Sequence, residues 1–537
     1  MIQGKGTAVF AGVAIGKAYL FRRSAGELPA FCGDAEKELQ AFDQARETAR
    51  QQLQALFEKT KEELGEEQAM ILDVQCMMLD DLDYIEAVQD EIRQGNSAAA
   101  AADAIGTLFS QQFAEMDDDY MRARSVDVKD MAKRLTAILC GGAAELEITE
   151  PVVLIADDLS PSETVQLPKD KILAFVTCQG STNSHTAILA RMMSIPSLVQ
   201  TDIPLDDSVQ GKTIIVDGFE GCYYLDPDQK TLAEMQDKQR LTQQKQQLLE
   251  QYRGKPTVSK SGKKIKLFAN IGSPDDVQYV LKGDAEGVGL MRSEFLYLGR
   301  DTFPTEEELF DAYRSVVEQL EGRELVIRTL DIGADKKVDY FGLEPEENPA
   351  LGYRGIRICL KQPEIFRPQM RAIYRASAFG PVSAMFPMIA SVKEVLAVKE
   401  FCRTIREELK AEGIPFGEVA LGVMIETPAA AVISRDLAKE VDFFSVGTND
   451  LTQYTLAVDR QNAKLAEFCD THHPAVLALL KMIVDNAHAE GIWAGICGEL
   501  GADTTMTEEF LKMGYDELSM SPAKVLEVRR IICESEE

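Results

Sequence analysis

The pattern of apolar and polar positions divides the chain into stretches of different period. Residues 7–10 and 13–20 form short apolar and β-branched runs, which predict strands near the N-terminus. Residues 35–64 contain no Gly or Pro and are rich in Glu, Gln, Ala, Lys and Leu, which predicts one long helix. Further helical stretches reach about residue 140, with breaks near Gly65, Gly95-Asn96 and residues 117–119. This part predicts a helical block without strands.

Strand patterns return after the helical block. Apolar runs at 152–156, 172–176 and 213–216 predict strands, and a helix is expected to begin near His185 between the last two. We therefore expect an α/β domain made of residues 1–22 plus 145–228, into which a helical domain of residues 34–144 is inserted. Residues 229–254 are polar and Gln-rich with little apolar stripe to bury, which predicts a linker helix.

From Ile265 onward, strand and helix patterns alternate regularly. Eight strand candidates in this part are the number that a (β/α)₈ barrel requires, which predicts such a barrel over residues 255–537. The expected fold class is multidomain α/β, in which an α/β domain with an inserted all-α domain precedes the barrel. The candidates are residues 266–271, 287–290, 325–330, 384–388, 421–425, 443–446, 493–496 and 517–520.

Composition narrows the classes of partner. The 537 residues carry 57 Lys and Arg against 88 Asp and Glu, a net charge of −31 that disfavours nucleic acid and anionic membranes and favours a basic protein partner. The ten cysteines show no CxxC pair or metal-ligand spacing, as expected for reduced thiols in the cytoplasm. The N-terminus lacks a signal-peptide core, and no run approaches about 20 apolar residues. We therefore expect no membrane insertion.

The loop before the helix at residue 185 carries unusual chemistry. A run of Gly, Ser, Thr and Asn places His185 in the first turn of the helix: Gly180-Ser181-Thr182-Asn183-Ser184-His185-Thr186. Helix N-termini favour negative charge, and their backbone N–H groups bind phosphate. A histidine there can take up a phosphoryl group covalently. The alternative is that His185 only packs against the helix or caps it.

Polar residues follow the predicted barrel strands at the points where those strands end. Several are arginines, whose guanidinium groups bind phosphate and carboxylate through paired hydrogen bonds. Arginines that converge on one mouth predict a site for a small polyanion. The residues concerned are Arg292, Arg328, Arg354, Glu426, Asn449, Asp450, Arg460 and Cys497.

Two carboxylates at this mouth, Glu426 and Asp450, would face the same anion. Because that arrangement is costly without a cation, they predict a Mg²⁺ site that substrate oxygens and water complete. Cys497 could donate a proton, and nearby Mg²⁺ and arginines would lower the pKa of its thiol. Taken singly, each charged residue could instead form a surface ion pair, and Cys497 could be a buried structural thiol beside Trp493.

In combination, the sequence motifs of the His185 loop and of the barrel strand ends resemble those of Enzyme I of the bacterial sugar phosphotransferase system, the phosphoenolpyruvate–protein phosphotransferases. The resemblance covers essentially the whole chain, with departures at Gln179, where the family more often has Gly, and at Asn183. Pyruvate phosphate dikinase and phosphoenolpyruvate synthase share these motifs but need an ATP-grasp domain, for which this chain has no room. Besides the His185 loop, the motifs are Arg328-Thr329-Leu330-Asp331-Ile332-Gly333-Ala334-Asp335-Lys336, Gly447-Thr448-Asn449-Asp450-Leu451-Thr452-Gln453 and Ile496-Cys497-Gly498-Glu499.

The resemblance implies a role for each site residue. His185 would be the phosphorylated histidine of a swivelling domain, and Cys497 would protonate the enolate that phosphoenolpyruvate leaves. Glu426 and Asp450 would ligate Mg²⁺. The residues implied to bind the phosphate or carboxylate of phosphoenolpyruvate are Arg292, Arg328, Asn449 and Arg460, with Arg354 nearby.

The resemblance also implies two protein partners. The helical block would dock the histidine phosphocarrier HPr, and the barrel would form a homodimer. We expect the docking face to combine acids with apolar residues, namely Glu66, Glu67, Asp80, Asp81 and Asp83 around Met70, Ile71, Met77, Met78 and Leu79. The alternatives are an ATP-dependent enzyme of the dikinase or synthase type, a non-catalytic regulatory homologue, and a nitrogen-regulatory paralogue with an extra N-terminal domain.

Overall fold

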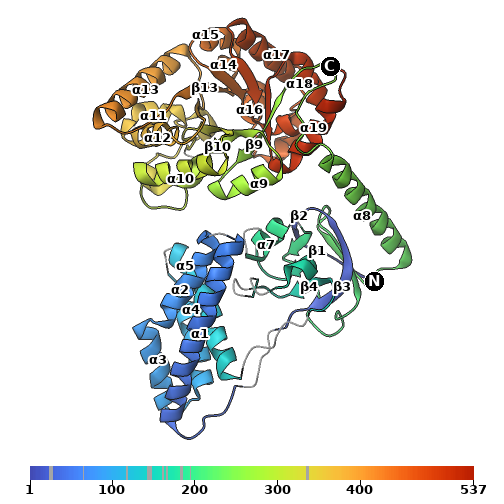
Figure 1. Ribbon diagram of the computed structural model, residues 1–537, viewed down its shortest axis with the longest axis vertical. Helices are drawn as coiled ribbons and strands as arrows, with labels where there is room; N and C mark the ends of the chain where they lie inside the picture. Colours follow the sequence, from blue (N-terminus) through green and yellow to red (C-terminus); the bar gives the residue numbers. More distant parts are fainter. Residues whose placement is uncertain are drawn as a thin grey trace. The chain divides into compact units, whose positions relative to one another are not determined.

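The computed structural model describes residues 1–537 apart from 23–27, 65, 117–118, 142–147, 160–162, 165–166, 182–184, 194 and 334–337. The chain separates into two compact units, Met1–Lys245 and Gln246–Glu537. Each unit has its own sheet (Figure 1). Each also has its own buried apolar core.

Within the described residues, the first unit is built on an eight-stranded mixed sheet of order β1-β8-β7-β3-β4-β5-β6-β2. β3 and β4 pair in parallel although the helical block lies between them in the sequence. All five predicted strands are present, whereas the short strands β1, β6 and β8 were not predicted. The strands are β1 (Ile2–Lys5), β2 (Thr7–Phe10), β3 (Val13–Leu20), β4 (Val152–Ala156), β5 (Ile172–Thr177), β6 (Ser197–Val199), β7 (Thr213–Asp217) and β8 (Cys222–Leu225).

The described residues between β3 and β4 form helices joined by loops and no strand, as predicted, and the predicted break at Gly95-Asn96 lies between α3 and α4. In α1, Phe42, Ala45, Ala49 and Leu53 recur on one face and are at most 3% exposed, which is the spacing a half-buried helix requires. The predicted breaks at Gly65 and residues 117–118 lie outside the described residues. The helices are α1 (Ala35–Leu64), α2 (Glu66–Leu79), α3 (Leu82–Arg93), α4 (Ala98–Ala114) and α5 (Asp119–Leu139).

The predicted polar helix is α8 (Gln229–Glu250), and none of its residues is buried. Lys238 pairs at 2.5 Å with the buried carboxylate of Asp217 on β7, and the side chain of Gln239 donates to the carbonyl of Val13 on β3. After the helix, Arg253 donates to the carbonyl of Lys282 in the second unit. No described helix is both long and apolar enough to span a membrane.

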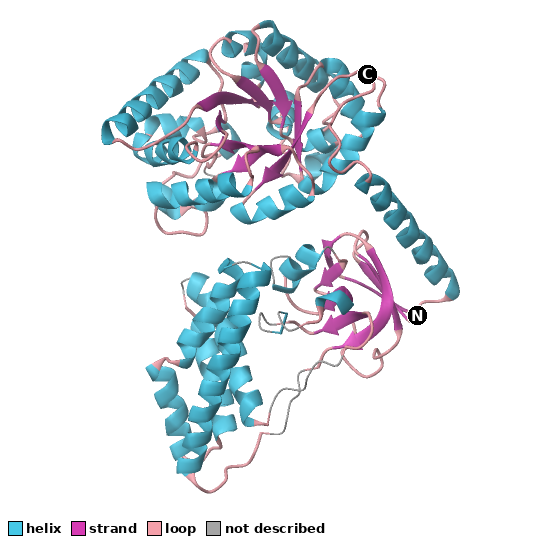
Figure 2. Cartoon of the chain, viewed as in Figure 1, coloured by secondary structure: helices cyan, strands magenta, loops and turns pink. Residues whose placement is uncertain are grey.

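In the second unit, eight parallel strands, all within the described residues, close into a barrel, which confirms the predicted fold. Each of the eight strand candidates overlaps an observed strand, and Figure 2 shows the strands enclosed by helices. The strands are β9 (Lys266–Ile271), β10 (Gly287–Arg292), β11 (Glu324–Arg328), β12 (Val382–Phe386), β13 (Val419–Ile425), β14 (Phe443–Val446), β15 (Trp493–Ile496) and β16 (Glu517–Met520).

The barrel interior is a packed core. Phe443 stacks on Trp493 with ring centroids 4.6 Å apart, and Gly422 makes room for them, since a Cβ there would lie 2.2 Å from the Phe443 ring. Apolar helix faces cover the outside of the strands. The helices are α9 (Val277–Lys282), α10 (Glu306–Gln319), α11 (Ile356–Lys361), α12 (Pro363–Ala376), α13 (Val392–Glu412), α14 (Pro428–Val432), α15 (Ser434–Ala438), α16 (Thr448–Leu456), α17 (Pro474–Ala489), α18 (Thr507–Met513) and α19 (Val525–Glu534).

Candidate active site at the barrel mouth

The predicted polar residues of the second unit lie where its strands end. Arg292 and Arg328 are the last residues of β10 and β11 and stand opposite each other in the parallel pairing. Because the carboxyl ends of parallel barrel strands meet at one face, residues at these positions share one mouth. The others are Glu426 directly after β13, Asn449 and Asp450 in the first turn of α16 after β14, and Cys497 directly after β15.

Two of the arginines are mostly buried and are held by carboxylates. Arg328 pairs with Glu294 at 3.0 Å and with Asp331 at 3.0 Å, and its side chain is 12% exposed. Arg354 pairs with both oxygens of Asp331, at 3.0 and 2.9 Å. Burial acts to lower the pKa of each guanidinium, but the carboxylates outweigh it and raise both pKa values. Arg292 differs from these two because it is exposed.

Glu294 and Asp331 are functional-site candidates that the sequence reasoning did not assign. Glu294 is 8% exposed, and one of its oxygens accepts hydrogen bonds from Arg328 and from the backbone N–H of Asp331 at 3.1 Å. Asp331 is 6% exposed. Their position in the sequence could have indicated them, because each lies within three residues of an arginine that ends a strand.

Glu426 is almost completely buried at the mouth. One of its oxygens accepts a hydrogen bond from the backbone N–H of Met388 at 2.5 Å. Burial, followed by the charges of Asp331 and Asp450, raises the pKa of Glu426 to about 8. Gly447 keeps the space beside the second oxygen open, since a Cβ there would lie 3.0 Å from it.

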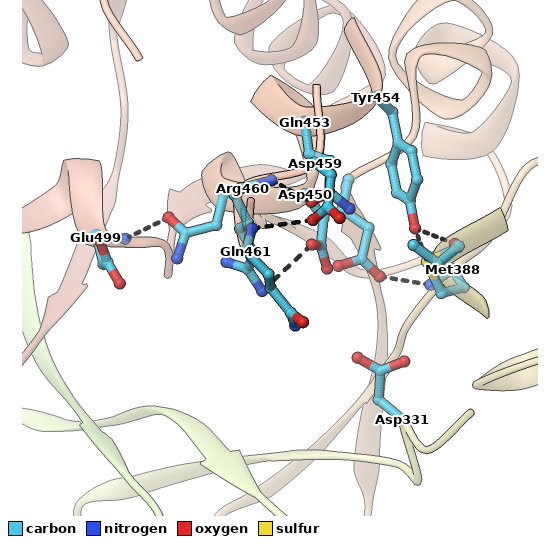
Figure 3. Close-up of polar contacts among 12 residues, drawn as sticks. Asp331, Met388, Asp450, Gln453, Tyr454, Asp459, Arg460, Gln461 and Glu499 are labelled. Carbon is cyan, nitrogen blue, oxygen red and sulfur yellow. Dashed lines mark hydrogen bonds and ion pairs between the residues drawn. The ribbon is translucent and has the colours of Figure 1, made fainter. Parts of the chain in front are cut away.

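Asp450 and its neighbours form the part of the mouth that Figure 3 shows. Asp450 pairs with Arg460 at 3.4 Å and lies 3.8 Å from Arg354. The backbone N–H of Arg460 donates to the side chain of Gln453, which keeps the loop beside α16. The side-chain oxygen of Asn449 accepts from the backbone N–H of Glu499, so its amide N–H groups remain as donors.

The carboxylates of the mouth fit a divalent cation. Glu426 is buried against like charges that raise its pKa, a cost that a cation between it and Asp450 would offset. Among the described residues there is no group of three or more His, Cys, Asp or Glu that could hold a metal by itself. Two carboxylates are the small protein contribution that Mg²⁺ accepts when substrate oxygens and water supply the rest.

Cys497 lies at the predicted place, but the prediction of a lowered pKa is wrong. The thiol is 2% exposed and packs in the barrel interior with Phe443 and Met424. Burial raises the pKa of Cys497 to about 12, while Ser445 and Arg328 act in the opposite direction. Its sulfur lies 3.6 Å from the carbonyl oxygen of Val446. The thiol is therefore a protonated group at neutral pH.

The histidines differ in their surroundings. α7 (His185–Met193) begins at His185, as predicted, and Gly180 in the preceding loop has a positive φ of +95°. The side chain of His185 and residues 182–184, which include Asn183, lie outside the described residues. His472 and His488 pair with Asp503 and Asp516, at 2.7 and 2.9 Å. The ring of His473 accepts from the N–H of Ala475 and caps α17, as expected of structural histidines.

The predicted acidic and apolar face of the helical block is only partly present. Leu79 is 1% exposed and belongs to the core of the block, and Met78 packs against that core, because this face of α2 faces its neighbours. Asp80 pairs with Arg46 and Arg50, and Asp81 caps α3. Met77 is 68% exposed and fits the prediction. The side chains of Glu66, Glu67, Met70 and Ile71 lie outside the described residues.

Family models match three successive parts of the chain. The model of the N-terminal region of PEP-utilising enzymes matches residues 5–124, that of their mobile domain residues 148–221, and that of their PEP-binding domain residues 246–537. Together with the closed barrel and its mouth of arginines and carboxylates, these matches define the chain as a PEP-utilising enzyme.

Curated relatives narrow this class further. The phosphoenolpyruvate-protein phosphotransferase of Staphylococcus carnosus is 41% identical over 99% of this chain and 93% of its own length. That of Bacillus subtilis is also 41% identical, over 98% and 94%. The chain belongs to the phosphoenolpyruvate-protein phosphotransferase family. A solution structure of an Enzyme I protein, 31% identical, covers 44% of this chain and 99% of its own with a TM-score of 0.39.

Proposed function

We propose that this chain takes the phosphoryl group of phosphoenolpyruvate onto His185, passes it to the histidine of the carrier HPr and releases pyruvate, as the first step of sugar uptake by the phosphotransferase system. The observation that carries the proposal is the meeting of Arg328, Arg354, Glu426 and Asp450 at one barrel mouth in a member of this family. Paired arginines suit a phosphate, and paired carboxylates suit the cation that accompanies it.

Phosphoenolpyruvate would bind at this mouth through its two anionic ends. Arg292 and Arg328 stand side by side on neighbouring strands and would hold the phosphate, with Arg354 close to Arg328 through Asp331. Arg460 and the amide N–H groups of Asn449 would bind the phosphate or the carboxylate. Guanidinium groups are suited to both ends because each binds two anionic oxygens at once.

Glu426 and Asp450 would hold Mg²⁺, which when bound supplies positive charge at the transferring phosphoryl group and at the enolate oxygen. A neutral His185 ring nitrogen, by family resemblance Nε2, attacks phosphorus as the bond to the enolate oxygen breaks. Cys497 then gives its thiol proton to the methylene carbon, which yields pyruvate. The raised pKa of this buried thiol keeps the proton in place until a carbanion-like carbon is present.

The rest of the chain would serve transport of the phosphoryl group. Residues 1–22 plus 145–228 would form the phosphohistidine domain, residues 34–144 the HPr-binding domain, and residues 229–254 the linker between them and the barrel of residues 255–537. The barrel would also form the homodimer. A cytoplasmic location suits a soluble carrier and substrate. It also suits the ten cysteines, all of which are free thiols.

The test is incubation with phosphoenolpyruvate labelled in its phosphate, with Mg²⁺. We expect acid-labile, base-stable label on the protein, its loss on addition of HPr, and none on His185→Ala. Folded His185→Ala should still bind phosphoenolpyruvate. The label should not form from ATP carrying the same isotope in its γ-phosphate. Full labelling of His185→Ala would contradict the assignment, and labelling from ATP would favour a dikinase-type enzyme.

A further inference from the structure

Asp331 lies between Arg328 and Arg354, the two mostly buried arginines of the mouth. Its carboxylate pairs with Nη1 of Arg328 at 3.0 Å and with Nη2 of Arg354 through both oxygens, at 3.0 and 2.9 Å. The Nε of Arg354 also donates to Asp331, at 3.3 Å. The contacts with Arg354 are paired hydrogen bonds of the kind through which a guanidinium group also binds a phosphate, and the contact with Arg328 is an ion pair.

Each arginine has a second contact that does not depend on Asp331. Arg328 donates to Glu294 at 3.0 Å, and Glu294 is anchored in turn by the backbone N–H of residue 331. Arg354 lies 3.4 Å from the hydroxyl of Tyr454 and 3.8 Å from Asp450. Glu294 and Tyr454 can therefore keep the two side chains in the mouth when the Asp331 carboxylate no longer pairs with them.

The space beside Asp331 is kept free of a side chain. Gly355 faces this carboxylate, and a Cβ at that position would lie 3.0 Å from its Oδ1. Gly355 also has a φ of +56°, which a residue with a Cβ rarely adopts. Glycine here meets both needs, because a Cβ would press on the Asp331 carboxylate and on the side chain of Met388.

We propose that Asp331 is an internal competitor for the substrate phosphate: in the ligand-free mouth its carboxylate occupies the guanidinium groups that a phosphate would take. This inference rests on the proposed function and concerns the affinity of that same site. A phosphate that reaches Arg328 and Arg354 must displace the pairing with Asp331 or share the arginines with it. Like charges a few ångströms apart repel, so the competitor weakens binding of every phosphate-bearing ligand.

The pairing of Asp331 with the two arginines has a physical advantage in a site that must release its ligand after each turnover. Two buried guanidinium groups without counter-ions would be costly, and they would hold any phosphate strongly. Asp331 supplies the counter-charge while the site is empty. Asp331 thereby lowers the affinity of the mouth for inorganic phosphate, while both arginines stay in place to bind the substrate. Glu294 is anchored by the backbone N–H of residue 331 while it accepts from Arg328, so we expect it to position this arginine and to have the opposite effect on phosphate binding.

The test measures ligand binding by calorimetry in EDTA, with phosphoenolpyruvate, inorganic phosphate and pyruvate as separate probes. Asp331→Asn removes the charge but keeps a similar shape. We expect it to bind phosphoenolpyruvate and inorganic phosphate about tenfold more tightly than the wild type, with pyruvate binding unchanged. Glu294→Gln is the matched control, because it removes one charge from the same cluster. It should bind phosphate more weakly, since Arg328 loses its permanent partner.

Other results would overturn the proposal. If Asp331→Asn binds phosphate equally or more weakly, Asp331 is a support for the arginines and not a competitor. A parallel change for pyruvate would show a general disturbance of the mouth and would also overturn it. Should Asp331→Asn melt well below the wild type, Asp331→Ser is measured in its place against the same criteria. A wild type that neither binds nor is labelled by phosphoenolpyruvate with Mg²⁺ would refute the proposed function itself, which is a separate outcome.

Discussion

The backbone N–H of Met388 donates to Oε1 of Glu426 at 2.5 Å. This contact depends on an uncommon backbone, because Met388 has a φ of +57°. Such a left-handed conformation costs roughly 1–2 kcal/mol for a residue with a Cβ. Strain of this kind persists where the surroundings determine the conformation, often at functional sites. The loop after β12 is thus shaped to hold one oxygen of a proposed metal ligand.

Substitutions at Met388 should separate backbone conformation from side-chain packing. Met388→Gly loses the side chain but adopts a positive φ freely, so Glu426 should keep its N–H contact. Met388→Val also loses part of the packing of the methionine side chain, and its β-branched side chain disfavours a positive φ. We expect Mn²⁺, measured by electron paramagnetic resonance, to bind Met388→Val about tenfold more weakly than Met388→Gly. Equal Mn²⁺ affinity in the two folded variants would contradict a role for this N–H.

The two carboxylates should be required for both metal binding and rate. Asp450→Asn or Glu426→Gln leaves the remaining carboxylate facing phosphate without its cation, so we expect a rate loss on the order of 10²-fold or more. Mn²⁺ affinity should fall with the rate. Asp459→Asn is the control, since Asp459 is an exposed carboxylate nearby whose oxygen accepts a hydrogen bond from the local backbone N–H of Gln461. Normal activity and Mg²⁺ dependence in Asp450→Asn would refute the metal assignment.

The barrel and its strand-end residues could be predicted because long alternating segments carry a strong period and because parallel strands end at one face. The same reasoning placed Glu426, Asp450 and Cys497 correctly at that face. It did not identify Glu294 or Asp331 as candidate site residues, since both look like ordinary loop acids until their distances to Arg328 are known.

Two of the predictions made from the sequence were wrong for physical reasons. The pKa of Cys497 depends on burial, and a strand-end position in the sequence does not reveal whether the side chain points into a dry core or toward solvent. On α2, the run of apolar residues around Met77 and Leu79 has no clear helical period. The division into an exposed Met77 and a buried Leu79 therefore follows from helix packing and could not be predicted from the pattern.

The helical block should be sensitive to volume at Gly106. A Cβ at this position in α4 would lie 2.1 Å from the Cβ of Ala132 on α5. Gly106→Ala should therefore destabilise the block by about 1–3 kcal/mol, although alanine is the better helix former. Thr107→Ala, one residue along on the exposed face, should be neutral or slightly stabilising. Calorimetry of the full chain measures both, and a stabilised Gly106→Ala would show that the helices can separate freely.

Docking of a basic carrier should depend on the exposed part of α2 and on salt. Met77 is 68% exposed, and Asp73 and Asp80 lie on the same helix or directly after it. We expect Met77→Ala to raise the KM for HPr severalfold, and the transfer rate to fall as ionic strength rises. Leu108→Ala, which alters another exposed apolar residue of the block, is the control. Equal effects of the two variants, or transfer insensitive to salt, would argue against this surface.

Cys497 should act on the enolate carbon rather than on the phosphoryl group. Cys497→Ala should lose turnover to pyruvate more severely than it loses binding of phosphoenolpyruvate, because we propose this buried, protonated thiol as the proton source at the mouth. Cys402→Ala is the matched control, since Cys402 on α13 is also 2% exposed, and burial raises its thiol pKa to about 12 as well. Both variants remove a buried sulfur, so a purely structural thiol predicts similar losses of stability and activity.

Isotope incorporation distinguishes a proton-donating Cys497 from a purely structural one. In deuterated water the wild type should place one deuterium on the methyl carbon of pyruvate with a defined facial selectivity, and Cys402→Ala should do the same. Cys497→Ala should protonate the enolate slowly and without selectivity, since water would have to enter a site that the barrel core closes from below. A well-folded Cys497→Ala that keeps both the wild-type rate and the wild-type selectivity would show that another group is the acid.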